Sequence, residues 1–180
     1  MSSAELARRI HERSHLTGRF VLRSGAEASA YFDKYAFEAD PELLREVAEA
    51  LLLLLPDDLD AVAGLELGGI PLATMLSQLS GLPTTFVRKQ AKTYGTCRLA
   101  EGSETAGRRL AVIEDVVTSA GQVIESSRQL RDHGAEIAVV LCVIDREAGG
   151  RENLAAEGLD LRSLFTMSEL EAAAGDPTSP

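Results

Sequence analysis

Residues 110–122, LAVIEDVVTSAGQ, decide the fold of this 180-residue chain. Four apolar residues run into two adjacent carboxylates, Glu114 and Asp115, and two valines, a turn of small residues (118–121) and a helical pattern follow. Two adjacent acids alone would equally suit a solvated surface turn. A buried strand that leads through a small-residue turn into a helix instead favours a site that binds a phosphorylated sugar. The carboxylates can accept hydrogen bonds from vicinal hydroxyls, and the helix N-terminus can bind the phosphate.

The remaining apolar segments alternate between strand and helix patterns. Residues 61–65 and 84–87 have the length of strands, and 137–144, IAVVLCVI, is typical of a strand covered on both faces. Strands that alternate with helices imply an α/β domain with a central, mostly parallel sheet flanked by helices. Helical spacing and capping residues predict a first helix capped by Ser2 or Ser3 and further helices over 41–56, 70–80 and 121–133.

Composition bounds the class of protein. A single domain over residues 1–180 is expected, with 45% hydrophobic and 26% charged residues. Aromatic residues make up 4% and the net charge is -10, which argues against nucleic-acid binding. The longest apolar run, 51–55, is too short to cross a bilayer, and Cys97 and Cys142 give neither a disulfide framework nor metal-ligand spacing. We therefore expect a soluble, cytoplasmic protein with no nucleic-acid or membrane partner.

A second candidate anion site lies in residues 64–71, GLELGGIP. There a strand leads into a turn with Gly68 and Gly69, and a helix begins close to Pro71. Glycines let backbone amides approach an anion at close range, although an ordinary strand-to-helix turn explains so short a pattern equally well.

A third candidate is the basic segment 88–95, RKQAKTYG. Arg88, Lys89 and Lys92 place three cations within five residues of an acidic chain, which suits an anion site or a solvated basic loop. Residues 88–108 have no apolar period, so we expect a long loop there, and loops of this length inside a compact domain are usually functional.

Residues 112–122 resemble the phosphoribosyl-diphosphate (PRPP) signature of the type I phosphoribosyltransferases. The resemblance implies that the two acids bind the ribose hydroxyls and that the turn holds the 5-phosphate. It also makes residues 64–71 the diphosphate-binding loop, with Gly68 and Gly69 in contact with PRPP; many relatives carry a basic residue where Gly68 stands. The residues of the signature to which it assigns PRPP binding are Glu114, Asp115, Val116, Val117, Thr118, Ser119, Ala120, Gly121 and Gln122.

Residues 88–95 look like the catalytic loop of the orotate phosphoribosyltransferases, with Tyr94 in place of the usual His. This similarity implies that Arg88, Lys89, Lys92 and Tyr94 contact PRPP and that Arg88, Lys89 and Lys92, with Asp115, are catalytic. The loop would close as a lid over the active site of the neighbouring subunit of a homodimer. Gly95, Gly102 and Gly107 would allow the hinge motion that such a lid needs.

Two more segments, 20–25 (FVLRSG) and 29–32 (SAYF), resemble the amino-terminal hood of the same family, which we expect at about 1–40. The resemblance places Arg23, Tyr31, Phe32, Thr118 and Arg146 around orotate, because an anionic planar base suits a guanidinium fork. The residues from about 171 to 180 look like a frayed tail.

The resemblance as a whole implies an orotate phosphoribosyltransferase of pyrimidine synthesis. It would convert orotate and PRPP into orotidine 5'-monophosphate and diphosphate, with Mg²⁺ as the cofactor, held through substrate and water. Two alternatives stay open at this point: a phosphoribosyltransferase for another base, and a PRPP-sensing regulator of the same fold.

Overall fold

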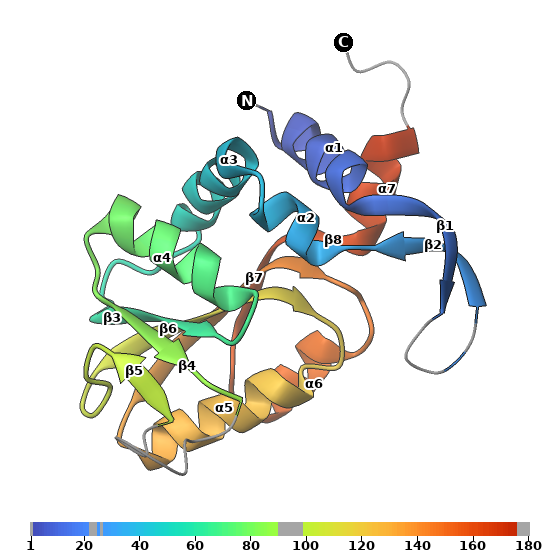
Figure 1. The fold of residues 1–180 in the computed structure, drawn as a ribbon. Coiled ribbons are helices and arrows are strands. Elements are labelled where there is room, and N and C mark those ends of the chain that lie inside the picture. The colour runs from blue at the N-terminus through green and yellow to red at the C-terminus, as the bar shows by residue number, and fades with distance from the viewer. Residues whose placement is uncertain (1, 22–24, 26, 90–98, 176–180) are drawn as a thin grey trace.

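A six-stranded sheet forms the centre of the protein (Figure 1). The computed structural model describes residues 2–21, 25, 27–89 and 99–175. The strand order is β5-β4-β3-β6-β7-β8, and every pairing is parallel except that of β5 with β4. This confirms the expected α/β class. The strands of this sheet are β3 (Ala61–Leu65), β4 (Thr84–Val87), β5 (Ala100–Gly102), β6 (Arg109–Val117), β7 (Glu136–Asp145) and β8 (Leu161–Thr166).

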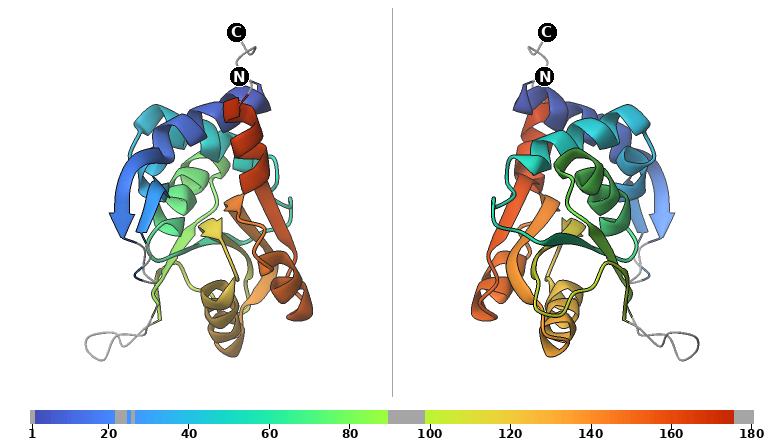
Figure 2. Two further views of the ribbon diagram at one scale, coloured as in Figure 1. Left: turned by 90° about the vertical axis from the view of Figure 1, so that its right-hand side faces the viewer. Right: turned by 90° about the vertical axis from the view of Figure 1, so that its left-hand side faces the viewer.

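Helices cover both faces of this sheet (Figures 1 and 2). One hydrophobic core joins the sheet to α1, α3, α4 and α7, and a second joins it to α5 and α6. Within β6, Ala111 and Ile113 belong to the first core, whereas Leu110 and Val112 belong to the second. The continuous apolar run is therefore a strand buried on both faces. The helices are α1 (Ser3–Ser14), α2 (Lys34–Glu38), α3 (Pro41–Leu52), α4 (Gly69–Ser80), α5 (Gly121–Asp132), α6 (Gly150–Ala156) and α7 (Met167–Gly175).

The expected capping residues are in place. The Ser2 hydroxyl accepts a hydrogen bond from the Glu5 amide at the start of α1, which confirms the first predicted helix. Asp40 caps α3 by accepting from the amides of Glu42 and Leu43. α4 ends at Gly81, whose φ of 77° is the left-handed conformation that favours glycine.

An antiparallel hairpin of β1 (His15–Val21) and β2 (Glu27–Phe32) extends away from the sheet (Figure 1). β1 is exposed over nearly its whole length, whereas β2 alternates between exposed and half-buried residues and ends at Phe32, which packs against the first core. This short pattern did not lead to a prediction of the two strands from the sequence. α1 lies against α7, so the N-terminal elements rest on the C-terminal helix at one end of the sheet (Figures 1 and 2).

Several element bounds differ from the sequence prediction. α3 ends at Leu52 rather than continuing to residue 56. The segment 88–108 contains β5, which pairs with β4 and therefore is not loop throughout. α7 continues to Gly175 with Leu170 buried, so residues 171–175 are helical rather than frayed, while 176–180 lie outside the described residues. In the part of the chain that the structure describes, no helix has the length and apolar character needed to span a membrane.

Candidate active site

The predicted site residues follow the ends of three neighbouring parallel strands. β6 lies between β3 and β7. Gly68 and Gly69 follow β3, Glu114 and Asp115 lie near the end of β6, and Arg146 follows β7. Because parallel strands share one carboxyl edge, segments far apart in the sequence meet there, at the place where open α/β sheets bind ligands.

A pocket at this edge combines four segments of the chain. Glu66 and Leu67 follow β3, Lys89 follows β4, and Lys34 and Tyr35 come from α2. The structure therefore brings the predicted acid segment and Lys89 to one pocket. The remaining lining residues come from β6, the turn after it and the start of α5: Glu114, Val116, Val117, Thr118, Ser119, Ala120, Gly121, Gln122 and Val123.

The turn between β6 and α5 is shaped for an anion. Ala120 has a φ of 64°, a left-handed conformation that an L-residue other than glycine adopts at some cost, and it serves as the N-cap of α5. No side chain caps that helix, so the amides of its first turn are open to a ligand. The side chains of Thr118 and Ser119 are exposed beside them.

α6 supports this turn from behind, which the sequence did not reveal. The Asn153 side-chain amide donates to the Ser119 carbonyl at 3.0 Å. A Cβ at Gly150 would lie 2.4 Å from the Thr118 carbonyl oxygen, so α6 can approach the turn only because that residue has no side chain. Neither residue belongs to a recognisable motif, and only the packing of α6 identifies them.

The loop after β3 is packed equally closely against β6. A Cβ at Gly69 would lie 2.1 Å from the Ile113 carbonyl oxygen, and a Cβ at Gly68 would lie 1.8 Å from Asp115 Oδ2. The peptide bond between Glu66 and Leu67 is cis. α4 begins in this loop, and no side chain caps its first turn. A second uncapped helix N-terminus therefore lies at the site.

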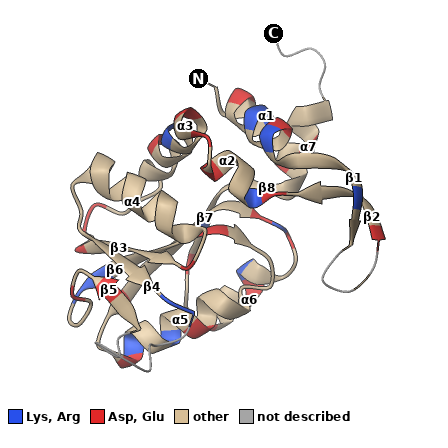
Figure 3. Cartoon of the chain, viewed as in Figure 1, with Lys and Arg blue, Asp and Glu red and all other residues tan. Residues whose placement is uncertain are grey.

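The acid pair is buried, and its two members differ in access. Figure 3 shows few charged residues along the central strands. Glu114 and Asp115, on β6, are both buried. Glu114 lines the pocket, whereas Asp115 does not. The Asp115 carboxylate is covered by Lys34, whose Nζ lies 2.8 Å from Oδ2 and 3.0 Å from Oδ1. Sequence analysis missed Lys34, because one lysine after an aromatic pair carries no pattern.

Three carboxyl groups around Lys34 share a low-dielectric site. Burial raises the pKa of Glu114, and its contact with Asp115 raises it further. Burial and the charge of Asp115 raise the pKa of Glu38, on α2, to about 9. Although burial opposes it, hydrogen bonds from Glu114 and Lys34 hold the pKa of Asp115 below its usual value. Asp115 therefore carries the negative charge, while Glu38 is neutral at pH 7.

The start of the basic segment is tied to the loop after β3. The Lys89 amide donates to Glu66 Oε2 at 3.0 Å, and the Arg88 amide donates to the Leu99 carbonyl at 3.0 Å. Glu66 is a second residue that sequence analysis missed. Lys92 and Tyr94 lie outside the described residues.

The expected base-binding residues are dispersed. Tyr31 is exposed and packs beside Phe20 with ring centroids 5.6 Å apart, while Phe32 packs against the first core. Neither they nor Arg146 are among the described residues that line the pocket. Arg23 lies outside the described residues, so the base site of Arg23, Tyr31, Phe32 and Arg146 stays a prediction.

The backbone around Arg146 is nevertheless fixed. Its amide donates to the Val117 carbonyl at 2.9 Å, which joins it to the end of β6. The buried Asp145 carboxylate accepts from the Glu147 amide at 2.9 Å and pairs with Arg151 at 3.3 Å. The Arg146 side chain is therefore presented from a well-anchored turn at the carboxyl edge of the sheet.

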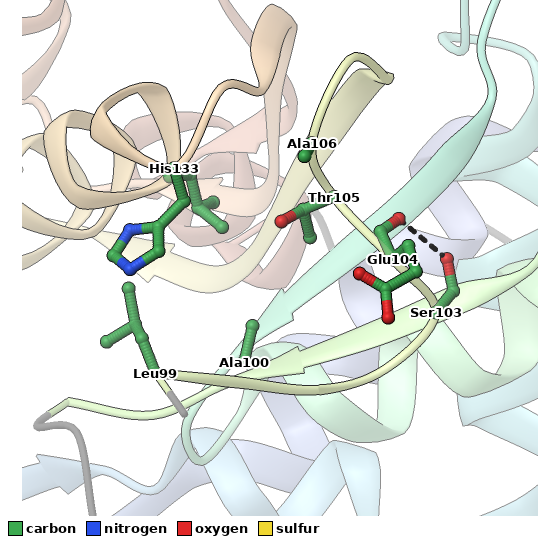
Figure 4. Close-up of a pocket in the computed structure, with 8 residues that line it drawn as sticks. Leu99, Ala100, Ser103, Glu104, Thr105, Ala106 and His133 are labelled. Carbon is green, nitrogen blue, oxygen red and sulfur yellow. Dashed lines mark hydrogen bonds between the residues drawn. The ribbon is translucent and has the colours of Figure 1, made fainter. Parts of the chain in front are cut away.

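A separate pocket lies between β5 and the C-terminal end of α5 (Figure 4). His133 borders it and has Nδ1 2.7 Å from the Gln129 carbonyl oxygen, with Leu99 and Thr105 among its neighbours. It shares no lining residue with the pocket at the strand ends. Over the described residues, no three His, Cys, Asp or Glu side chains gather in a group that could hold a metal ion.

Comparison with known proteins assigns the family. Residues 36–159 match the model of the phosphoribosyl transferase domain. The chain is 55% identical to an orotate phosphoribosyltransferase of Nocardioides sp. over 170 residues, which cover 94% of this chain and 95% of the relative. This chain belongs to the orotate phosphoribosyltransferase family.

Further members of the orotate phosphoribosyltransferase family share both sequence and structure with it. The enzyme of Methanocella arvoryzae is 43% identical over 85% of this chain and 87% of its own. The Mycobacterium tuberculosis orotate phosphoribosyltransferase in complex with inorganic phosphate superposes with a TM-score of 0.84 at 32% identity, covering 94% of this chain and 98% of that chain. The same M. tuberculosis enzyme in complex with PRPP gives a TM-score of 0.81 at 31% identity, with the same coverage. The resemblance inferred from the sequence and the type I phosphoribosyltransferase fold are both confirmed.

The close packing of the loop after β3 should make this member of the orotate phosphoribosyltransferase family sensitive to an added side chain at Gly69. Gly69→Ala places a methyl group against the Ile113 backbone, so we expect the free energy of unfolding to fall by about 1–3 kcal/mol or more. Urea unfolding followed by circular dichroism measures the change. Gly175→Ala is the control, since nothing lies within 4 Å of its added Cβ. Equal stability of both variants would contradict the packing argument.

The buried carboxyl of Glu38 makes stability depend on pH. Its pKa is raised to about 9 in the folded protein, against about 4.3 in an unfolded chain. The native state then binds more protons between these values, so Glu38 lowers stability as pH rises. In Glu38→Gln that loss is absent. Relative to the parent protein, the variant should gain unfolding free energy as the pH rises from about 5 towards 9.

Urea unfolding of both proteins at several pH values in that interval measures this difference. Glu49→Gln, which removes an exposed carboxyl on α3, is the matched control and should give a curve parallel to that of the parent protein. A Glu38→Gln curve that is also parallel would show that Glu38 is ionised in the native state.

Proposed function

We propose that this member of the orotate phosphoribosyltransferase family transfers the phosphoribosyl group of PRPP to orotate. The products are orotidine 5'-monophosphate and diphosphate, as de novo pyrimidine synthesis requires. The observation that carries the proposal is the single pocket that combines Glu114, the uncapped start of α5 and Lys89. It offers an acceptor for hydroxyl groups, an anion site and a cation within one cavity.

The 5-phosphate is assigned to the turn before α5. Its oxygens would accept from the amides of Ala120, Gly121 and Gln122 and from the hydroxyls of Thr118 and Ser119. The positive end of the helix dipole favours the phosphate charge. The left-handed conformation of Ala120, with its φ of 64°, shapes the turn that would hold the phosphate.

The ribose is assigned to the acid pair and the diphosphate to the loop after β3. Glu114, in the pocket, and Asp115, beneath it, would bind the 2- and 3-hydroxyls. The backbone amides of Gly68 and Gly69 would face the diphosphate. Arg88, Lys89 and Lys92 would stabilise the charge that develops on the diphosphate as the bond to C1 breaks, an electrostatic role worth several kcal/mol in such sites.

The acidic side chains at the pocket suit a Mg²⁺ ion that is held mostly by the diphosphate of PRPP and by water. Glu66 and Glu114 supply two carboxyl groups at the pocket, and among the described residues no three His, Cys, Asp or Glu side chains form a group that could hold a metal ion without the substrate. Mg²⁺ commonly binds through one or two carboxylates together with phosphate oxygens and water. When bound, the ion would neutralise part of the diphosphate charge and so improve it as a leaving group.

The chain itself then orients the reaction. Glu114 and Asp115 fix the ribose while C1 acquires oxocarbenium character, and the orotate nitrogen attacks C1 from the face opposite the diphosphate. Orotate is already an anion, so no residue needs to act as a strong general base. Closure of the segment that contains Lys92 and Tyr94 would exclude water and suppress hydrolysis.

Orotate would lie between the hood and the end of β7. Arg146 would pair with its carboxylate, Thr118 would contact it from the phosphate turn, and Arg23, Tyr31 and Phe32 would border the ring. A homodimer would place the lid of one subunit, about residues 88–108, over the site of the other. One domain over 1–180 with a hood at about 1–40, and a cytoplasmic location, complete the proposal.

The direct test is the loss of orotate absorbance on addition of PRPP and Mg²⁺. Hypoxanthine, adenine and uracil are run in parallel as competing bases. Consumption of orotate alone is expected, and it should stop when the metal is chelated. Turnover of another base instead of orotate would show that the protein is a phosphoribosyltransferase for that base. PRPP binding without turnover of any base would favour a regulator.

Lys89→Ala tests the electrostatic role of the basic segment. Loss of the ammonium should lower kcat by about 100-fold or more, because charge on the leaving diphosphate is no longer stabilised. Steady-state kinetics with saturating substrates measures the effect, and urea unfolding checks that stability is unchanged. Arg128→Ala removes an exposed cation of α5 as the control. Near-normal turnover of Lys89→Ala would remove this residue from the mechanism.

Arg146→Ala tests the base site. Loss of a charge-assisted pair with the orotate carboxylate should raise KM for orotate by about 10- to 100-fold while KM for PRPP stays within about threefold. Arg146→Lys should recover only part of the affinity, because an ammonium lacks the planar fork. An unchanged KM for orotate in Arg146→Ala would assign the carboxylate to another residue.

A further inference from the structure

Lys34 stands at the place where the diphosphate loop lacks a side chain. A Cβ built on Gly68 would lie 1.8 Å from Asp115 Oδ2, and Lys34 Nζ lies 2.8 Å from that same oxygen. In this conformation a side chain at residue 68 would meet the Asp115 carboxylate. Gly68 carries no charge itself, and the ammonium group of Lys34 approaches the same carboxylate oxygen from α2.

Lys34 also faces the substrate pocket. Among the described residues that line this pocket, Lys34 and Lys89 are the two cations, and Lys34 is 35% exposed while Asp115 beneath it is fully buried. Glu66 and Glu114 add acidic groups to the same lining. A polyanionic substrate therefore meets carboxylates here, and a cation is needed to offset them.

The contact with Asp115 shows which movement substrate binding requires. Asp115 has no exposed side-chain surface and pairs with Lys34, so a ribose hydroxyl that binds the Asp115 carboxylate would displace the ammonium group from it. The four-carbon stem of lysine is flexible and its ammonium is a compact donor, so a small rotation carries the charge from Asp115 to a neighbouring phosphate oxygen.

We propose that Lys34 is a PRPP-binding residue of this enzyme, which moves from Asp115 to the diphosphate when the ribose hydroxyls take its place on that carboxylate. Lys34 thus supplies from the hood the charge that Gly68 cannot supply from the loop. The inference rests on the proposed function for the identity of the substrate. Its physical basis, a cation at the diphosphate loop, can be tested by binding alone.

The test measures binding of PRPP and of inorganic diphosphate, both with Mg²⁺, by isothermal titration calorimetry, together with steady-state kinetics. Lys34→Met should weaken the binding of both ligands by about 10- to 100-fold. Lys34→Arg, which keeps the charge, should stay within about fivefold of the parent protein. KM for orotate at saturating PRPP should change by less than about threefold. Arg45→Met removes an exposed cation of α3 and should change none of these values.

A second variant separates binding from stability. Lys34→Met leaves the buried Asp115 charge unpaired and is expected to lower stability. In Lys34→Met/Asp115→Asn no such charge remains, so stability should recover while diphosphate binding stays weak. Parent-like diphosphate and PRPP affinity in the folded Lys34→Met protein, or recovery of diphosphate binding in the double variant, would overturn the proposal. Absence of orotate turnover in the parent protein would refute the proposed function but leave this binding comparison intact.

Discussion

The rest of the site depends on the absence of space between the start of α4 and strand β6. An added Cβ at Gly69 would lie 2.1 Å from the Ile113 carbonyl oxygen, and one at Gly64 would lie 2.6 Å from the Gly69 carbonyl oxygen. Backbone therefore packs directly on backbone at the carboxyl edge of the sheet. This contact sets how far the loop after β3 stands from Glu114 and Asp115, at the edge where open α/β sheets bind ligands.

Electrostatics at this edge follow from the same close packing. Three carboxyl groups lie in a small buried volume, and a low dielectric makes several adjacent negative charges costly. The pKa values of Glu38 and Glu114 are raised, which favours the neutral form of both carboxyl groups. The pKa of Asp115 is lowered, and its carboxylate pairs with Lys34. The ion pair between Lys34 and Asp115 thus joins α2 to β6 at the candidate site.

The sequence predicted the elements that the two cores impose. The apolar runs of β6 and β7 and the capped starts of α1 and α3 were readable because burial and local hydrogen bonds act on neighbouring residues. The hairpin β1–β2 was not, because β1 is exposed and the alternation of β2 is short, with half-buried rather than buried residues on one face. The three-residue strand β5 exists through its pairing with β4, which no local pattern encodes.

The same division holds for the site. By itself, the sequence determined the family and located the acid pair, the small-residue turn before α5 and the basic segment as candidate site segments, since each is a continuous run of residues. Only the tertiary structure decided that Asp115 is buried beneath Lys34 while Glu114 faces the pocket, that Glu66 holds the Lys89 backbone, and that Gly150 and Asn153 support the turn. The hydrogen-bonded pair Glu66 and Lys89 is 23 positions apart in the sequence, and the pair Lys34 and Asp115 is 81 positions apart. Such contacts are fixed by the packing of whole elements rather than by any local pattern.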